Sequence, residues 1–150
     1  MPDNKIISWE EVYVVGIEQI DHQHKELVSL VNQLFQACLE GNEHVAETFK
    51  ETMSSMVDYV RFHFTAEQKL LTRINYPNFI EHKKQHDTLV LDILNAAKEY
   101  NEGKKFIPNN FVRTLRDWVL SHIAVSDKSY AAYIQEQKHK GLLTDKQING

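Results

Sequence analysis

The sequence is poor in three residues that constrain a chain, with one cysteine, three prolines and five glycines in 150 residues. A single cysteine excludes a disulfide within the chain. Cys38 falls on an apolar helical stripe, so we expect a buried structural thiol. The scarcity of proline and glycine leaves long uninterrupted segments, which favour long helices.

Long apolar runs and clusters of basic residues are also missing. No segment approaches 18 consecutive apolar residues, and residues 1–5 lack a basic region followed by an apolar run. We therefore expect no membrane span and no secretion signal, and a cytoplasmic protein. The net charge is −4 with a pI near 6.0, and lysine and arginine are dispersed, so nucleic acid is not an expected partner.

Length and composition predict one globular domain over residues 1–150, because a chain of this size with 42% hydrophobic residues can bury a sizeable core. Residues 1–16 hold aromatic and β-branched side chains without helical spacing, which predicts an extended arm laid over one end of the core. The core is expected from about residue 17 to 137. A polar tail, frayed in solution, should follow at 138–150.

Four segments of the core carry apolar residues every three or four positions, the spacing of amphipathic helices. They run over about 18–40, 43–74, 78–102 and 109–137. Gly41-Asn42 predicts a helix stop followed by an N-cap, and Asn78 offers an N-cap to the third helix. Because the connections are short, the sequence predicts an all-α fold, an antiparallel four-helix bundle of up-down-up-down topology.

Histidine is abundant, with eight residues, and several histidines and acids occupy positions on the apolar stripes. His82 and His86 lie four residues apart, so they share one helix face. In the fourth helix the stripe should include Trp118, His122 and Val125, with Asp127 on the adjoining flank. In an up-down-up-down bundle, seven such residues fall in one half of the bundle. They are His24, His63, Glu67, His82, His86, His122 and Asp127.

Burying five imidazoles and two carboxylates without compensation would cost several kcal/mol for each unsatisfied group. Metal ions provide that compensation directly, since neutral imidazoles donate nitrogen and carboxylates can bridge two cations. The set suits two six-coordinate ions that share a bridging oxygen, with one coordination position open. Imidazole with carboxylate suits iron, and the lack of thiolate ligands argues against a structural zinc site.

The motifs that carry these residues resemble the hemerythrin family, specifically its single-domain bacterial members. Trp9 and Gly16-Ile17 resemble the N-terminal arm of that family, and the likeness covers roughly residues 9 to 137. The matching stretches are Ile20-Asp21-His22-Gln23-His24-Lys25-Glu26-Leu27, His63-Phe64-x-x-Glu67, His82-x-x-x-His86 and Trp118-x-x-x-His122-Ile123-x-x-x-Asp127-x-x-Tyr130.

The resemblance implies a non-haem di-iron centre that binds O2 reversibly and is not primarily an enzyme site. It implies that one iron takes three histidines and the other takes two, that both carboxylates bridge, and that O2 goes to the iron with two histidines. The first iron would take His82, His86 and His122, the second His24 and His63, and the bridges would be Glu67 and Asp127. We expect a monomer or weak homo-oligomer, and the sequence identifies no protein partner.

An apolar pocket around bound O2 should exclude water. Our candidates for its lining are Phe64, Trp118, Val119, Ile123 and Leu27, the last one helical turn from His24. Two other functions stay open. One is a di-iron enzyme acting on peroxide, nitric oxide or O2, which is disfavoured because no acid, thiol or tyrosine is clearly placed in the pocket. The other is a metal store or structural module, for example one that holds zinc.

Several polar residues have two interpretations. Tyr130 either packs in the core or hydrogen-bonds a group near Asp127. Asp21 either caps the first helix or orients an imidazole. We expect the remaining histidines at the surface, namely His22, His44 and His139.

Overall fold

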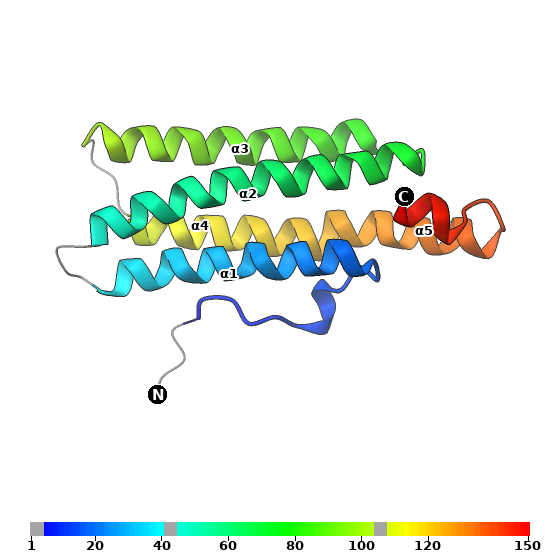
Figure 1. Ribbon diagram of the computed structural model, residues 1–150, viewed down its shortest axis with the longest axis horizontal. Coiled ribbons are helices and arrows are strands. Elements are labelled where there is room, and N and C mark those ends of the chain that lie inside the picture. The colour runs from blue at the N-terminus through cyan, green and yellow to red at the C-terminus, as the bar shows by residue number, and fades with distance from the viewer. Residues whose placement is uncertain (1–4, 41–44, 104–107) are drawn as a thin grey trace.

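The computed structural model describes residues 5–40, 45–103 and 108–150 and confirms the all-α, up-down-up-down four-helix bundle. Figure 1 shows the long helices lying side by side with alternating direction. The first three rods are single helices, and the fourth consists of three consecutive helical segments. The bounds are α1 Glu18–Glu40, α2 Val45–Arg73, α3 Phe79–Asn101, α4 Pro108–Ser121, η2 His122–Asp127 and α5 Lys128–His139.

The helix ends agree with the expected boundaries to within two residues. The predicted stop and N-cap at Gly41-Asn42 lie outside the described residues. Asn78 does occupy the N-cap position of α3, but its side chain makes no capping bond, and its carbonyl oxygen accepts the His82 N–H at 3.0 Å. The helix α2 ends at Arg73, and two residues later Asn75 has a φ of 53°, in the left-handed region that asparagine tolerates.

The fourth rod differs from the expected uniform helix because η2 is a π-helical turn. In a π-helix the hydrogen bonds run over five residues, so the turn is wider than an α-helical one. His122 and Asp127, five residues apart, are both buried, whereas Val125 is 63% exposed. The prediction that Val125 lies on the core stripe was therefore wrong, because the extra residue per turn rotates it outward.

The N-terminal arm runs beside α1 and contains one short 3-10 helix, η1 Glu11–Tyr13 (Figure 1). The Asn32 side chain holds its start, accepting the N–H groups of Ile6 at 3.0 Å and Ile7 at 2.9 Å. The Asp21 carboxylate holds its end, accepting the N–H groups of Val15 at 2.8 Å and Gly16 at 3.1 Å. Asp21 thus secures the turn into α1 through N–H groups of the arm, which differs from both expected roles, a cap on the first turn of α1 and an orienting contact to an imidazole.

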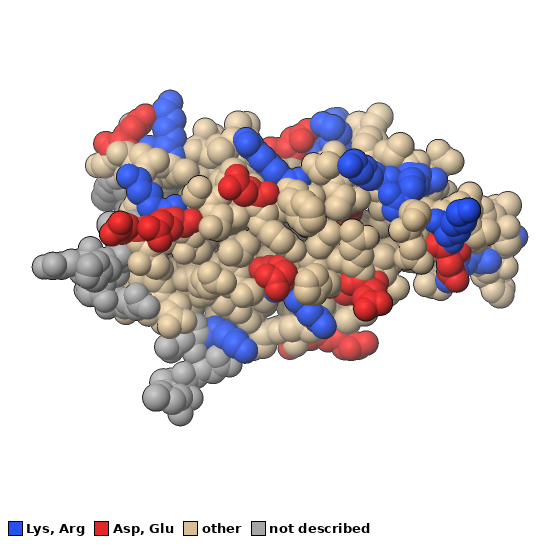
Figure 2. Space-filling view, in the orientation of Figure 1, with Lys and Arg blue, Asp and Glu red and all other residues tan. Residues whose placement is uncertain are grey.

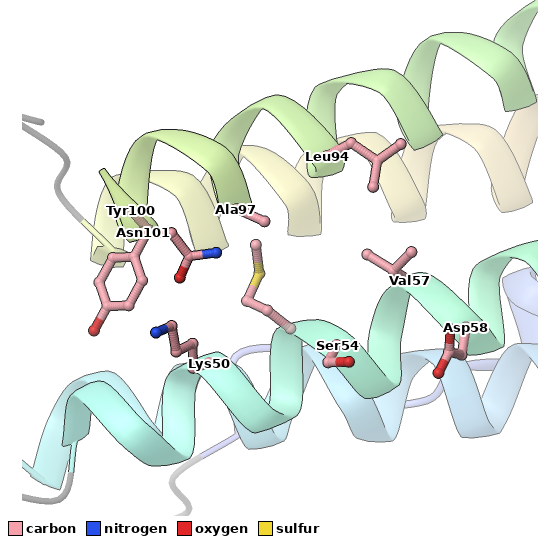
Figure 3. Close-up of a pocket in the computed structure, with 9 residues that line it drawn as sticks. Lys50, Ser54, Val57, Asp58, Leu94, Ala97, Tyr100 and Asn101 are labelled. Carbon is pink, nitrogen blue, oxygen red and sulfur yellow. The ribbon is translucent and has the colours of Figure 1, made fainter. Parts of the chain in front are cut away.

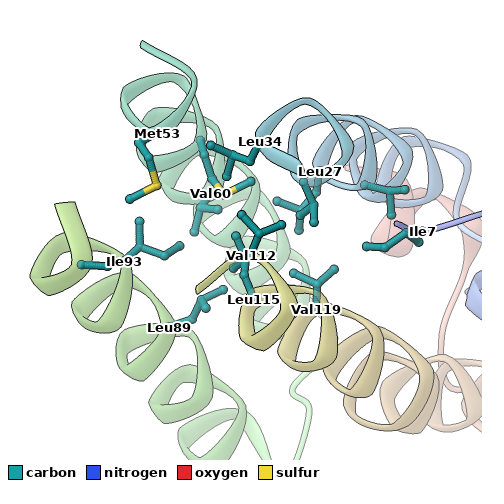
Figure 4. Packing of buried hydrophobic residues seen from close by; sticks show 14 of the residues in the cluster. Ile7, Leu27, Leu34, Met53, Val60, Leu89, Ile93, Val112, Leu115 and Val119 are labelled. Atoms are coloured by element: carbon teal, nitrogen blue, oxygen red, sulfur yellow. The ribbon is translucent and has the colours of Figure 1, made fainter. Parts of the chain in front are cut away.

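Two apolar clusters fill the bundle, one on each side of the polar residues. The larger lies toward the ends of α1 and α3 and the starts of α2 and α4 (Figure 4). The smaller includes Ile20, Leu71 and Ile134 at the opposite end. Cys38, expected to be buried, is only partly buried at the edge of the larger cluster. None of the helices in the described ranges is both long and apolar enough to cross a bilayer.

The C-terminal tail folds back onto the bundle, which corrects the expectation that residues 138–150 fray. A short helix, α6 Asp145–Asn149, begins with a capping box between Thr144 and Gln147. Ile148 is 4% exposed within the smaller apolar cluster. The Arg73 guanidinium donates to the carbonyls of Gln147 at 3.1 Å and Ile148 at 3.0 Å. Ile148, with Leu143 packed beside the same cluster and the Arg73 contacts, therefore anchors the tail.

Replacing Ile148 with alanine should lower the free energy of unfolding by about 2–3 kcal/mol, because a buried isoleucine loses its contacts. Chemical denaturation measures this value. The matched control is Ile80→Ala, since Ile80 is 70% exposed and its replacement should change stability by less than about 0.5 kcal/mol. Equal effects of the two substitutions would show that α6 is not docked.

Candidate metal centre

The structure brings the seven sequence-predicted polar residues together between the two apolar clusters. Their side chains come from α1, α2, α3 and η2, and none is more than 6% exposed. His22 and His139 are exposed, as expected, and His44 lies outside the described residues. The cluster consists of His24, His63, Glu67, His82, His86, His122 and Asp127.

Glu67 lies at the centre of this cluster, and its two carboxylate oxygens face different histidines. Oε1 lies 2.7 Å from His82 Nε2 and 3.0 Å from His86 Nε2. Oε2 lies 3.4 Å from the Nε2 atoms of both His24 and His63. The carboxylate therefore spans two sets of imidazoles, one on each side.

Asp127 divides the histidines in the same way. Its Oδ1 lies 3.1 Å from the Nε2 atoms of His82 and His122, while Oδ2 lies 3.0 Å from His24 Nε2. The Nε2 atoms of His86 and His122 are 3.1 Å apart. Two carboxylates thus connect a three-histidine set, His82, His86 and His122, with a two-histidine set, His24 and His63.

The hydrogen bonding within the cluster is incomplete. Both ring nitrogens of His24 and both carboxylate oxygens of Asp127 are buried, and none of these four atoms makes a well-aligned hydrogen bond among the described residues, although His24 Nε2 and Asp127 Oδ2 lie 3.0 Å apart. Buried polar atoms without partners are costly, and metal coordination would satisfy them. Ligand atoms lie within 4.8 Å of one another in two groups that share Glu67, each able to hold a metal ion. The donor set fits a pair of cations.

The electrostatics of the cluster depend on its two buried anions. Surface charges of both signs are solvated (Figure 2), whereas Glu67 and Asp127 are fully buried. Burial would raise the pKa of the Glu67 carboxyl, but hydrogen bonds from the histidines hold it well below its usual value. Burial would likewise lower the pKa of His24, yet Asp127 and Glu67 raise it to about 10. The carboxylates stay ionised, as metal ligands must be.

His86 and His122 differ in their response to the same surroundings. Burial lowers the pKa of His86 to about 4, and contact with Glu67 does not offset it. Burial also acts to lower the pKa of His122, but the charge of Asp127 raises it to about 9. His86 is therefore uncharged at neutral pH, the charge state in which an imidazole binds a metal.

Apolar and aromatic side chains surround the cluster. The Phe64 ring stacks on His86 with centroids 3.7 Å apart, and the Trp118 ring stacks on His122 at 4.6 Å. Val119, Ile123 and Leu27 are each at most 2% exposed in the larger apolar cluster. These contacts keep water from most of the cluster. Whether these five residues line a ligand pocket stays a prediction.

Tyr130 hydrogen-bonds into the cluster, which decides between its two interpretations. Its hydroxyl is buried and donates to Glu67 Oε2 at 3.2 Å. The partner is thus Glu67, whereas the sequence suggested a group near Asp127. Burial and the neighbouring carboxylate charges raise the pKa of the Tyr130 hydroxyl well above its usual value, so it remains a proton donor.

A surface groove of about 570 Å³ between α2 and α3 reaches the edge of the cluster, where Phe64 and His86 form part of its wall. A second pocket between the same helices, of about 300 Å³, lies toward the other end of the bundle (Figure 3). It is lined by residues such as Met53, Val57 and Tyr100 and contains no member of the cluster. Of these two pockets, the first reaches the cluster, at His86.

Three glutamines that the sequence analysis did not single out contact the outward ring nitrogens of the histidines. They are Gln23, Gln68 and Gln85, at 2.7–3.1 Å from the Nδ1 atoms of His63, His86 and His122, respectively. Each is the immediate neighbour in sequence of a cluster residue. On a helix, a neighbour points about 100° away, so such a residue can reach a histidine on another helix. The sequence signal that could have found them is a glutamine immediately beside three cluster residues, His24, Glu67 and His86.

A buried set of imidazoles and carboxylates within a four-helix bundle defines a metal-binding helical protein. The model of the hemerythrin HHE cation binding domain matches residues 15–134. The chain therefore belongs to the hemerythrin family. It is 33% identical to a bacteriohemerythrin of Methylococcus capsulatus over 110 residues, covering 73% of this chain and 82% of that protein.

Other relatives agree with this membership. A hemerythrin-like protein of Naegleria gruberi is 30% identical over 123 residues, covering 82% of this chain and 89% of that protein. The crystal structure of a wild-type hemerythrin superposes with a TM-score of 0.77 at 27% identity, covering 85% of this chain and 96% of that one. The likeness extends over most of both chains in each case.

The metal-free protein should lose stability as pH rises from about 6.5 through about 9–10. His24 and His122 have folded-state pKa values raised to about 10 and about 9, against 6.5 for a free histidine, so their stabilisation is complete below 6.5 and lost as they deprotonate. Urea denaturation at a series of pH values measures this. His122→Gln should flatten the profile and His22→Gln should not. A wild-type stability that is constant over this window would contradict the expectation.

Proposed function

We propose that this protein binds O2 reversibly at a non-haem di-iron centre. The observation that supports the proposal is the orientation of the Glu67 and Asp127 carboxylates. In each, one oxygen faces the three-histidine set and the other faces the two-histidine set. Two carboxylates in this arrangement suit adjacent cations. Imidazole and carboxylate donors without thiolate suit iron.

In this proposal His82, His86 and His122 hold one iron, His24 and His63 hold the other, and Glu67 and Asp127 bridge them. The unequal count would leave the second iron with an open coordination position, and a ferrous pair would supply the electrons that reversible O2 binding requires. The proposal thus accounts for an odd number of histidines in one cluster.

The other residues of the chain give the site its selectivity. Phe64 and Trp118 stack on His86 and His122 and limit water at the three-histidine side. In this proposal Leu27, Val119 and Ile123 line the pocket that O2 occupies. Tyr130 donates a hydrogen bond to Glu67 and so helps hold the carboxylate in position.

The purified protein should contain about two iron ions per chain. In the reduced, anaerobic form it should be colourless, gain a strong visible band in air and lose that band on degassing. Elemental analysis and a visible absorption spectrum with and without O2 measure these properties. Zinc in place of iron, or iron with no O2-dependent band, would overturn the proposal.

Replacing Glu67 with alanine should reduce bound iron to less than about one ion per chain, because both proposed positions lose a shared ligand. The matched control is Glu51→Ala, an exposed glutamate on the same helix, which should keep the wild-type iron content. Iron is measured against protein concentration after desalting. Full iron content in the Glu67 variant would exclude Glu67 as a bridge.

A second candidate function, a di-iron enzyme acting on O2 or peroxide, is favoured by one observation. The Tyr130 hydroxyl, 3.2 Å from Glu67, is a buried phenol in contact with a proposed iron ligand. Such a group can supply a proton or an electron to a reaction. If the protein is an enzyme, steady-state turnover with a reductant should fall at least about tenfold in Tyr130→Phe, whereas for an O2 carrier turnover is negligible in both forms. The control is Tyr133→Phe on the same helix, because the Tyr133 hydroxyl bonds the backbone carbonyls of Ile74 and Asn75 and no member of the cluster.

A further inference from the structure

The outward nitrogens of the histidines are not supported equally. In the three-histidine set, Nδ1 of His86 lies 3.1 Å from Gln68 Nε2, and Nδ1 of His122 lies 2.9 Å from Gln85 Oε1. In the two-histidine set, Nδ1 of His63 lies 2.7 Å from Gln23 Oε1, while Nδ1 of His24 has no hydrogen-bond partner in the described parts of the chain. Gln23 is thus the side chain that supports an imidazole of this set.

Gln23 is itself firmly held. Its side chain is only 4% exposed, and its backbone carbonyl accepts a hydrogen bond from the Tyr59 hydroxyl at 3.1 Å. It precedes His24 in α1, and its side chain reaches across to the His63 imidazole in α2. A buried, fixed acceptor of this kind determines the ring orientation of its histidine.

The three glutamine contacts differ in their chemistry. Gln85 Oε1 also accepts a hydrogen bond from the Ser126 hydroxyl at 2.7 Å, so this oxygen is shared between Ser126 and His122. Gln68 presents its Nε2 to His86, so the amide would have to rotate before it could accept a proton from Nδ1. Gln23 already presents its oxygen to His63. An imidazole that binds metal through Nε2 carries its proton on Nδ1, and Gln23 Oε1 is placed to accept that proton.

We propose that Gln23 is a positioning residue that fixes the ring of His63 for metal binding. Because Gln23 is neutral, it also shifts the oxidation equilibrium of the iron in the two-histidine set toward the reduced form. The first part depends only on metal binding at this cluster, and the second rests on the proposed di-iron function. A carboxylate at this position would make the imidazole a stronger donor and favour the oxidised iron. A neutral amide orients the ring without that effect.

Two substitutions separate these roles. Gln23→Leu removes the acceptor and should weaken iron binding by about 10- to 100-fold, measured by competition with a chelator. Gln23→Glu restores the acceptor and should return iron affinity to the wild-type level or above. It should also shift the oxidation equilibrium about tenfold toward the oxidised form, which is about 59 mV in the midpoint potential for one electron. The control is Gln33→Glu, which adds the same charge to an exposed site about 15 Å along α1.

The order of iron affinities distinguishes positioning from plain core packing. If Gln23 only fills space, buried glutamate should be worse than leucine, because an uncompensated charge costs more than an apolar replacement. Affinity in Gln23→Glu below that of Gln23→Leu would overturn the proposal. So would an unchanged potential in Gln23→Glu, or an equal shift in Gln33→Glu. If the wild-type protein binds iron but gives no O2-dependent band, the proposed function fails while the order of affinities still tests Gln23.

Discussion

The structure depends on the burial of two carboxylates and five imidazoles in the middle of an apolar bundle. Each buried charge without a partner would cost several kcal/mol, which is comparable with the whole stability of a domain this size. The carboxylates therefore contact histidines on every side, and the remaining unpartnered atoms of His24 and Asp127 are the ones that coordination would satisfy. This cluster makes folding and metal binding parts of one equilibrium.

The rest of the fold isolates this layer from water. Apolar clusters lie on both sides of it, so the cluster sits within the core instead of at one end of it. The π-helical turn brings Asp127 inward together with His122, which a regular α-helix would not do. The arm, secured by Asn32 and Asp21, and α6, anchored by Ile148, cover further apolar surface. Each of these features helps to keep water away from the buried polar cluster.

Neutral groups surround the charged cluster, and their neutrality affects how strongly the histidines donate electrons to a bound metal. Stacked rings of Phe64 and Trp118 and the amides of Gln23, Gln68 and Gln85 fix the imidazoles without adding charge. Supporting carboxylates would increase the electron donation of the histidines and favour oxidised metal. For the proposed di-iron centre, a neutral surround would favour the return to the reduced state after each cycle of binding.

The sequence by itself determined the helices and the identity of the cluster, because apolar spacing and inward histidines repeat with the helical period over long segments. His82 and His86 could be placed on one face from their spacing alone. The wider turn at His122–Asp127, the exposure of Val125, the docking of Ile148 and the reach of Gln23 to His63 were decided only by the tertiary structure. These features depend on contacts between segments 40 or more residues apart, or on a local change of helical period, and neither leaves a periodic signal in the chain.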